Sequence, residues 1–226
     1  MARLFDMHVH TNKGSSDSNL TPEDMILQSE RLGFFGICVT EHSGPWDQHE
    51  FKLFAEKHNQ TLIRAMEVET DMGHILAFGL AEYFPGISRA SKLREFATLS
   101  NGFIISAHPF RGLFANSVNR RPLLYPTGVD LPMTVEEAAG HEVFDLVDAI
   151  EVANGATIYE DNEFALKVAK HRSMKITGGS DAHSTHGLGR VITVFPDEIV
   201  TEEMFLNALH LGKYFPAMLS PNNMSE

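Results

Sequence analysis

The stretch Leu4-Phe5-Asp6-Met7-His8-Val9-His10 near the N-terminus combines apolar residues with three potential metal ligands. In a β-strand successive side chains point to opposite faces, so Asp6, His8 and His10 would share one face. Burying two imidazoles beside a carboxylate is costly unless a cation or hydrogen bonds compensate, and this donor set suits zinc, manganese or iron. The stretch therefore predicts a strand that contributes to a metal site; the alternative is a pair of half-exposed histidines on an edge strand.

Further apolar runs of strand length alternate with segments of helical periodicity along the chain. This alternation is typical of repeated βα units around a mostly parallel sheet, and it predicts an α/β fold. Thr21 and Pro22, followed by two acidic residues, predict the start of a helix, and residues 202–214 predict a closing helix. The predicted strands are residues 4–10, 35–42, 62–69, 74–79, 103–108, 149–154, 175–181 and 191–195.

Histidines and carboxylates recur where the predicted strands end. His42 ends the second strand, Glu67 lies near the end of the third, His108 ends the fifth, and Asp181 and His183 stand at the end of the seventh. Each residue alone is also typical of a cap, a turn or a solvated face. Active sites of α/β barrels are built at the C-terminal ends of the strands, so the recurrence predicts a polynuclear metal site at that edge.

Composition limits the protein's location and partners. The 226 residues include 18 basic and 30 acidic side chains, a formal net charge of −12, and this charge argues against duplex nucleic acid as a partner while allowing a small phosphorylated substrate. No apolar run approaches about 18 residues, no signal peptide is evident, and the only cysteine, Cys38, lies in an apolar run. We therefore expect a cytoplasmic protein without membrane spans, with a single domain over residues 1–226 and a long loop near residues 109–132.

Four short motifs occur in order along nearly the whole chain: His8-Val9-His10, Thr40-Glu41-His42, Ala107-His108-Pro109 and Ser180-Asp181-Ala182-His183. Together with Glu67, and at these separations, they resemble the motifs of the polymerase and histidinol phosphatase (PHP) superfamily of metal-dependent phosphoesterases. The resemblance implies a distorted (β/α)7 barrel. It also implies two to three divalent ions, variously zinc, manganese or iron, in a cleft at the C-terminal ends of the strands.

The resemblance further implies which residues hold each ion. One ion would be held by His8, His10, Glu67 and Asp181; a second by Glu67 as a bridge with His108 and His74; and a third would lie near His42, His183 and Asp17. The chain departs from the family in having Glu41 where aspartate is usual. We interpret Glu41 and Asp6 as outer partners that orient ligand imidazoles, because such imidazoles normally donate their other N–H to a carboxylate.

These residues predict a metal-dependent phosphoesterase that cleaves a small phosphomonoester or nucleotide-type phosphate, a short oligonucleotide included, through a metal-activated hydroxide. Asp181 and His183 are the candidate proton acceptors or donors. Among the cations of the long loop, Arg111 is expected to bind phosphate, whereas Arg120 and Arg121 are either further phosphate ligands or solvated loop residues. A metal-dependent amidohydrolase and a non-catalytic metal-binding module are the alternatives, and the oligomeric state stays open.

Overall fold

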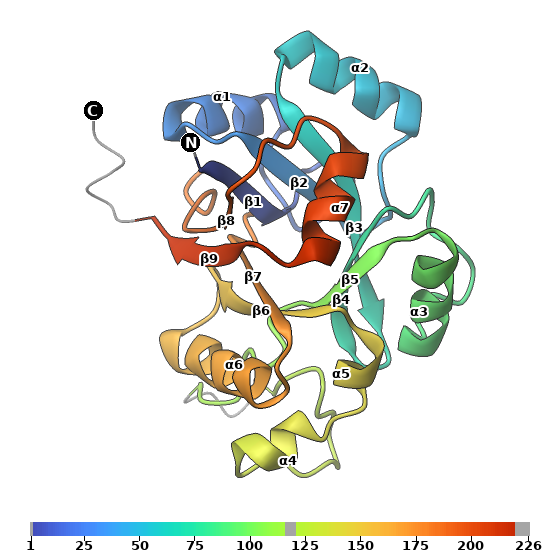
Figure 1. Cartoon of the computed structure of the whole chain (residues 1–226), viewed down its shortest axis with the longest axis vertical. Helices are drawn as coiled ribbons and strands as arrows, with labels where there is room; N and C mark the ends of the chain where they lie inside the picture. The colour runs from blue at the N-terminus through green and yellow to red at the C-terminus, as the bar shows by residue number, and fades with distance from the viewer. Residues whose placement is uncertain (1, 116–120, 220–226) are drawn as a thin grey trace.

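The computed structural model describes residues 2–115 and 121–219, and strands and helices interleave along the chain (Figure 1). The strands are β1 (Arg3–Val9), β2 (Gly36–Glu41), β3 (Thr61–Thr70), β4 (Gly73–Phe78), β5 (Phe103–Ser106), β6 (Ala149–Asn154), β7 (Lys175–Gly179), β8 (Val191–Phe195) and β9 (Phe215–Met218). The helices are α1 (Pro22–Leu32), α2 (Gln48–His58), α3 (Ala90–Leu99), α4 (Val135–Ala139), α5 (Val143–Leu146), α6 (Tyr159–His171) and α7 (Glu202–Leu211). All eight predicted strands are present, with ends shifted by at most two residues.

The nine described strands form one sheet in the order β7-β6-β5-β4-β3-β2-β1-β8-β9. The sheet nearly closes into a barrel, because the residues after β7 reach back to β1. The amide of Asp181 donates to the carbonyl of His8 at 2.7 Å, and the amide of His10 donates to the carbonyl of Ala182 at 3.0 Å. The predicted α/β barrel is thus confirmed, whereas the count of seven β/α units is not, since this sheet has nine strands.

Seven of the nine described strands run in the same direction, as expected of a mostly parallel sheet, and the other two, β4 and β8, run against them. β4 runs antiparallel to both β3 and β5, and β8 runs antiparallel to both β1 and β9. Only Asp71 and Met72 separate β3 from β4, and a two-residue connection can form a hairpin but not the crossover that parallel neighbours need. The N-terminal end of β4 therefore lies at the same sheet edge as the C-terminal end of β3.

Local signals set the helix ends. Thr21 caps α1 by accepting the amide of Asp24 at 3.1 Å, Pro22 occupies the first turn, and Gly33 ends the helix with a φ of 67°. The predicted closing helix is shorter than expected, because Gly212, with a φ of 73°, ends α7. The short strand β9 that follows contains Pro216, which is why sequence patterning did not indicate a strand there.

Helix α7 closes one end of the barrel. Its Phe205 ring lies 5.6 Å from Phe5, 5.5 Å from Phe78 and 5.6 Å from Phe195, measured between ring centroids, and all four rings are buried. Phe5 is near the start of β1, whereas Phe78 and Phe195 end the antiparallel strands β4 and β8. This aromatic core fills the end where the parallel strands begin, so the opposite end is left for a functional site.

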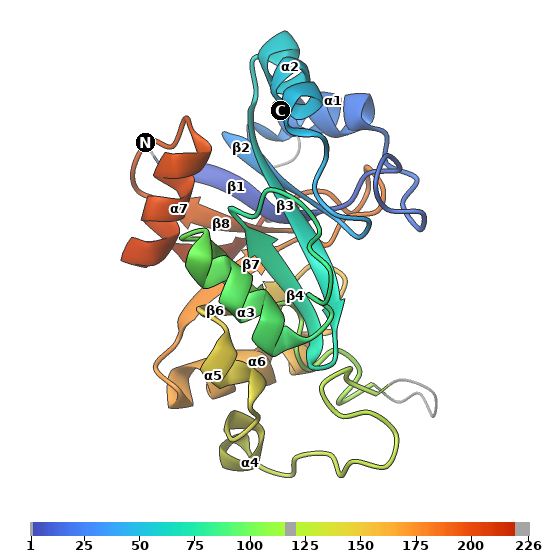
Figure 2. The ribbon, with the colours of Figure 1, turned by 90° about the vertical axis from the view of Figure 1, so that its right-hand side faces the viewer.

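The long predicted loop lacks helix and strand over its described residues, 109–115 and 121–132. It extends from the barrel below α3 before reaching α4 (Figure 2). Asp161 in the first turn of α6 is buried and accepts the amides of Gly112 at 2.7 Å and Phe114 at 2.9 Å, which fixes the first part of the loop. Within residues 2–115 and 121–219, no helix is long and apolar enough to cross a membrane.

Candidate metal centre

The nine predicted ligands lie at the sheet edge opposite α7. His8 and His10 come from the end of β1, His42 follows β2, and Glu67 lies within β3. His74 reaches the same edge from the beginning of β4 because that strand is antiparallel. The loops after β5 and β7 supply His108, Asp181 and His183, and the loop after β1 supplies Asp17. Contacts among these residues form three groups that share members.

The first group joins the buried side chains of His8, His10, Glu67 and Asp181. Nε2 of His8 lies 3.3 Å from Glu67 Oε2 and 3.6 Å from Asp181 Oδ1, and Nε2 of His10 lies 3.3 Å from each of these oxygens. Both Nε2 atoms are buried without a hydrogen-bond partner among the described residues. An unpaired buried polar atom costs about 1–3 kcal/mol, so two of them aimed at two carboxylates indicate a site for a cation.

The second group is built on the other oxygen of Glu67. Oε1 lies 2.9 Å from Nδ1 of His74 and 3.0 Å from Nε2 of His108. Glu67 therefore directs one oxygen toward each group. This geometry fits the bridging position expected for it, and it brings His74 to the place that the family resemblance implied.

The third group is more open to solvent. Nitrogen atoms of His10, His42 and His183 converge, and the side chains of His42 and His183 are 34% and 30% exposed. Asp17 Oδ2 lies 3.5 Å from Nε2 of His42 and 3.2 Å from Nε2 of His183. Asp17 is itself 59% exposed, so this group faces incoming solutes.

Glu151 of β6 orients the first group, although sequence reasoning did not single it out as a site residue. Its Oε1 accepts Nδ1 of His8 at 3.0 Å, and its Oε2 accepts the amide of His108 at 2.9 Å and Nδ2 of Asn154 at 2.9 Å. Because Nδ1 of His8 donates to Glu151, Nε2 is the nitrogen directed toward the carboxylates, where a cation would bind. The available signal was a single acid within the apolar run Ile150-Glu151-Val152.

Glu41 and Asp6, the two carboxylates expected to orient ligand imidazoles, make no direct hydrogen bond to an imidazole in the described part of the chain. Glu41 accepts the hydroxyl of Ser15 at 2.6 Å, and Ser15 Oγ lies 3.3 Å from Nδ1 of His10, so Glu41 reaches an imidazole through a hydroxyl. Asp6 contacts no imidazole in the described part of the chain. It accepts the amides of Ser180 and Gly189, each at 2.9 Å, and so ties the loop after β7 to β1.

Backbone conformation also serves the site. His108 and Asp181 have φ values of 31° and 54°, in the left-handed region that non-glycine residues seldom adopt. These turns direct both side chains back over the sheet edge. A Cβ on Gly179 would lie 2.4 Å from the Cβ of His8, so only glycine allows β7 to approach β1 this closely.

The charges of the first group favour a bound cation. Burial raises the pKa of Glu67 and Asp181, but the surrounding imidazoles outweigh it and hold both pKa values well below their usual range, with Arg111 contributing at Asp181. Both carboxylates therefore stay ionised at neutral pH. Burial lowers the pKa of His8, yet Glu151, Asp181 and Glu67 together raise it well above the usual value, so a cation bound at Nε2 would replace a proton there. Ionised carboxylates and convergent imidazole nitrogens are the donor set of zinc, manganese and iron sites, so these residues fit the expected ions.

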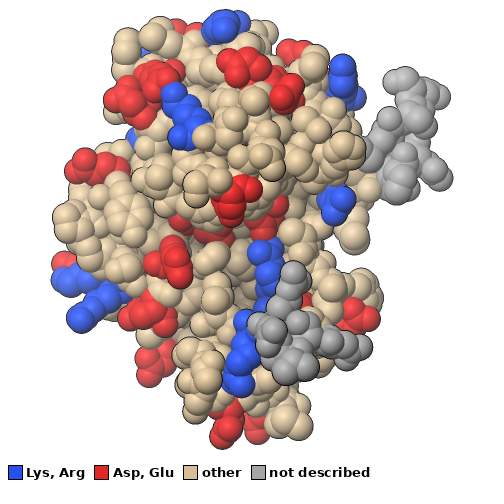
Figure 3. Space-filling view, turned by 180° about the vertical axis from the view of Figure 1, so that it is seen from behind, with Lys and Arg blue, Asp and Glu red and all other residues tan. Residues whose placement is uncertain are grey.

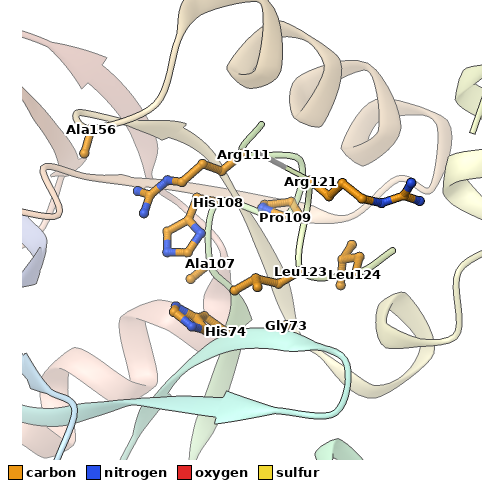
Figure 4. A pocket seen from close by; sticks show the side chains of 10 residues that line it. All are labelled: Gly73, His74, Ala107, His108, Pro109, Arg111, Arg121, Leu123, Leu124 and Ala156. Carbon is orange, nitrogen blue, oxygen red and sulfur yellow. The ribbon is translucent and has the colours of Figure 1, made fainter. Parts of the chain in front are cut away.

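The predicted substrate arginines behave differently from one another. Arg111 Nη2 donates to Asn154 Oδ1 at 2.8 Å and to Asp181 Oδ2, and its Nε donates to Thr157 at 3.0 Å. The guanidinium of Arg121 points away from His74 and His108 (Figure 4), and it donates to the carbonyls of Tyr125 and Val129. Arg120 lies outside the described residues.

Acidic side chains occupy the face that carries a central hollow. They lie in and around this hollow on the side opposite that of Figure 1, and a column of basic side chains runs beside it (Figure 3). An acidic centre next to a basic strip suits a site that binds cations first and an anionic substrate next to them.

The orienting contacts of Glu151 lead to a first prediction. Replacing Glu151 by Gln should weaken Zn²⁺ or Mn²⁺ binding by about 10- to 100-fold, because the amide cannot accept both the His8 ring and the His108 amide as the carboxylate does. Affinity would be measured by competition with a chelating dye. Asp148→Asn is the matched control, since Asp148 pairs with Arg94 and the Ile104 amide away from the site. The control should lower the melting temperature and leave the metal affinity unchanged; wild-type affinity in Glu151→Gln would contradict the assignment.

Family models match two regions of the chain. Residues 6–124, more than half of the chain, match the model described as "PHP domain", and residues 159–214 match the model described as "PHP-associated". All nine predicted ligands except Asp181 and His183 lie in the first region, and those two lie in the second. No curated protein matches the sequence at a significant level.

Solved structures share the fold at low sequence identity. PsfC from Pseudomonas syringae is 15% identical with a TM-score of 0.64, over 99% of this chain and 93% of its own. A protein from Bifidobacterium adolescentis described as a candidate metal-dependent phosphoesterase is 16% identical with a TM-score of 0.54, over 91% and 95%. Endonuclease Q, in complex with a 27-mer duplex carrying an abasic lesion at the active site, is 18% identical with a TM-score of 0.55, over 93% and 57%. At these identities the likeness shows the fold alone.

The endonuclease Q complex corrects one expectation. The net charge of −12 had argued against duplex nucleic acid as a partner, and that exclusion is wrong, because a protein of this fold binds a duplex at its active site. Net charge averages over the whole surface, whereas binding depends on the local field, and a bound cation or a basic strip can reverse that field. The acidic composition therefore does not exclude duplex substrates.

Proposed function

This chain belongs to the PHP domain family and is a metal-dependent hydrolase, and we propose that its substrate is a phosphoester, either a small phosphomonoester or a nucleotide-type phosphate. The observation that carries the proposal is the position of Glu67 between two ligand groups, with the guanidinium of Arg111 bound to Asp181 beside them. The two regions matched by family models would act as one domain, since the amide of Asp181 in the second donates to the carbonyl of His8 in the first.

The ligand geometry supports hydrolysis at two neighbouring ions. Glu67 offers Oε2 to His8 and His10, and Oε1 to His74 and His108, so one carboxylate separates the two groups. Ions held there would activate a water for in-line attack and neutralise the charge that develops on the phosphoryl oxygens. Zinc, manganese and iron all suit this donor set.

Arg111 supports an anionic substrate. Its Nε and Nη2 are used by Thr157, Asn154 and Asp181, and this fixes the plane of the guanidinium. The side chain is still 33% exposed and lines a cavity beside the ligands. A guanidinium held in a fixed plane, with part of its N–H edge still exposed, is well placed to bind a phosphoryl oxygen.

Proton transfer is assigned to His183 rather than Asp181. Asp181 directs Oδ1 toward His8 and His10 and Oδ2 toward Arg111, and its lowered pKa makes it a weak base. His183 is 30% exposed, and its Nδ1 lies 3.1 Å from the carbonyl of Asp181. A proton on Nδ1 would leave Nε2, which lies 3.2 Å from Asp17 Oδ2, to exchange a proton with a leaving oxygen.

The test is phosphate release or strand cleavage by protein loaded separately with Mn²⁺, Fe²⁺ or Zn²⁺. The substrates would be sugar phosphates, amino-alcohol phosphates, mononucleotides, short oligonucleotides, and a duplex with and without an abasic lesion. We expect turnover of at least one class, and His8→Ala should abolish it while circular dichroism still shows a folded protein. Silence across the panel with metal stoichiometrically bound would contradict the proposal and favour amide or lactone substrates. Failure to bind metal at all would favour a non-catalytic module.

A further inference from the structure

A cavity of about 340 Å³ opens beside the second ligand group (Figure 4). Its polar side comprises the imidazoles of His74 and His108 and the side chain of Arg111. Apolar side chains form the rest, Pro109 and Leu123 among them. Small-molecule sites typically range from about 300 to 1,000 Å³, so this cavity suits a compact ligand.

The apolar side of the cavity offers few hydrogen-bonding side chains. Six of the ten lining residues have no polar side-chain atom, namely Gly73, Ala107, Pro109, Leu123, Leu124 and Ala156. Arg121 also lines the cavity, but its guanidinium points outward and binds backbone carbonyls of its own loop, so its aliphatic stem is what remains for a ligand. A polyhydroxylated group placed there would lose hydrogen bonds to water without replacing them.

Leu123, on the apolar side of the cavity, is exposed although its neighbour Leu124 is buried. Leu123 is 52% exposed and Leu124 is 4% exposed. The backbone around them is fixed: the carbonyl of Leu124 lies 3.0 Å from Nε2 of His141, and the amide of Tyr125 donates to the carbonyl of Pro122 at 2.9 Å. A Cβ on Gly73 would lie 3.1 Å from the side chain of Leu124, so this segment packs closely against the β3–β4 turn. Leu123 is therefore held in place beside a charged site before any ligand arrives, which is typical of a preformed binding wall.

We propose that this cavity receives the organic group of the substrate, and that this group is compact, uncharged and apolar, such as a single aromatic ring. The inference rests on the proposed phosphoesterase function, since the anionic end of the ligand would lie toward His74, His108 and Arg111. Leu123 would then determine specificity by covering one side of the organic group. Sugar phosphates and other polyhydroxylated esters would be poorer ligands, because the wall cannot replace their hydration.

Binding of phosphonates tests the cavity without requiring turnover. Titration calorimetry on the metal-loaded protein would compare phenylphosphonate with methylphosphonate. We expect phenylphosphonate to bind at least about tenfold more tightly, and Leu123→Ser to reduce this ratio to about threefold or less without changing the affinity for methylphosphonate. Leu99→Ser is the matched control, because Leu99 is 77% exposed at the end of α3 and lies outside the cavity. Equal wild-type affinities, or a ratio that Leu123→Ser leaves unchanged, would overturn the inference.

Turnover separates the two proposals. Phenyl phosphate and glycerol phosphate would be assayed with the same protein samples. Hydrolysis of both at similar kcat/KM would overturn the substrate class and leave the phosphoesterase function intact. Selective phosphonate binding with no hydrolysis of any phosphoester would overturn the reaction and support the apolar wall. A preference for phenyl phosphate that disappears in Leu123→Ser supports both.

Discussion

Replacing Glu67 by Gln is expected to lower kcat/KM for the best phosphoester by at least about 1,000-fold, several kcal/mol of transition-state stabilisation. Glu67 lies within 3.4 Å of five imidazoles, more than any other predicted ligand contacts: those of His8, His10, His42, His74 and His108. The amide has the same shape but carries no charge, and it presents an NH₂ donor where the carboxylate offered an acceptor. Either orientation of the amide therefore impairs one of the two ligand groups.

For Glu67→Gln, the metal content of the protein must be measured alongside the hydrolysis rate. Metal stoichiometry would be measured by elemental analysis, and the fold by circular dichroism and thermal melting. We expect the variant to be folded and to retain less metal than the wild type. Glu69→Gln is the matched control, since Glu69 lies two residues along the same strand and is exposed. An effect below about tenfold in Glu67→Gln, with full metal content, would show that the two groups do not depend on a bridging carboxylate.

Strand periodicity explains why many residues of this candidate site could be proposed from the sequence. A side chain at the end of a strand in a barrel has few places to point, so Asp6-Met7-His8-Val9-His10 and the ends at His42, His108 and Asp181 identified a common edge. His74 was harder to predict, because it reaches that edge only through the antiparallel direction of β4. Its assignment, like that of Asp17, depended on family resemblance, and the contacts that each makes fit that assignment.

Hydrogen bonding between distant segments was not predictable from the pattern. Glu151 meets His8 across 143 residues of sequence, and Asp6 meets Gly189 across 183. Glu151 orients the His8 imidazole, the role predicted for Asp6, whereas Asp6 accepts hydrogen bonds from backbone amides. Which carboxylate approaches which imidazole depends on how the barrel closes, and no local spacing encodes that closure. The opposite directions of Arg111 and Arg121 have the same origin, because each guanidinium is oriented by partners that only the folded loop assembles.

Replacing Arg111 by Ala is expected to reduce kcat/KM for phosphoesters by at least about 100-fold and to leave the hydrolysis of uncharged amides or lactones much less affected. A guanidinium that contacts a transferring phosphoryl group stabilises its charge strongly, whereas a neutral carbonyl substrate makes no such demand. Arg111→Lys should recover only part of the loss. Lysine keeps the charge but not the planar fork that reaches Asp181, Asn154 and Thr157 together.

Arg111 also contacts Asp181, a predicted metal ligand, so Arg111→Ala could reduce activity by disturbing Asp181. Measuring the metal affinity of the variant distinguishes this cause from the loss of a phosphate contact. If Arg111 acted only by positioning Asp181, then Arg111→Ala would weaken metal binding and impair phosphoester and amide hydrolysis alike. If Arg111 binds the phosphoryl group, the loss falls mainly on phosphoesters at saturating metal, and KM rises with it. Arg172→Ala is the control, because Arg172 pairs with Asp145 at the end of α6, away from the ligands. Unchanged phosphoester kinetics in Arg111→Ala would reject the phosphate-binding role and shift the assignment toward amide hydrolysis, which the same two ligand groups could support without a cation from the protein.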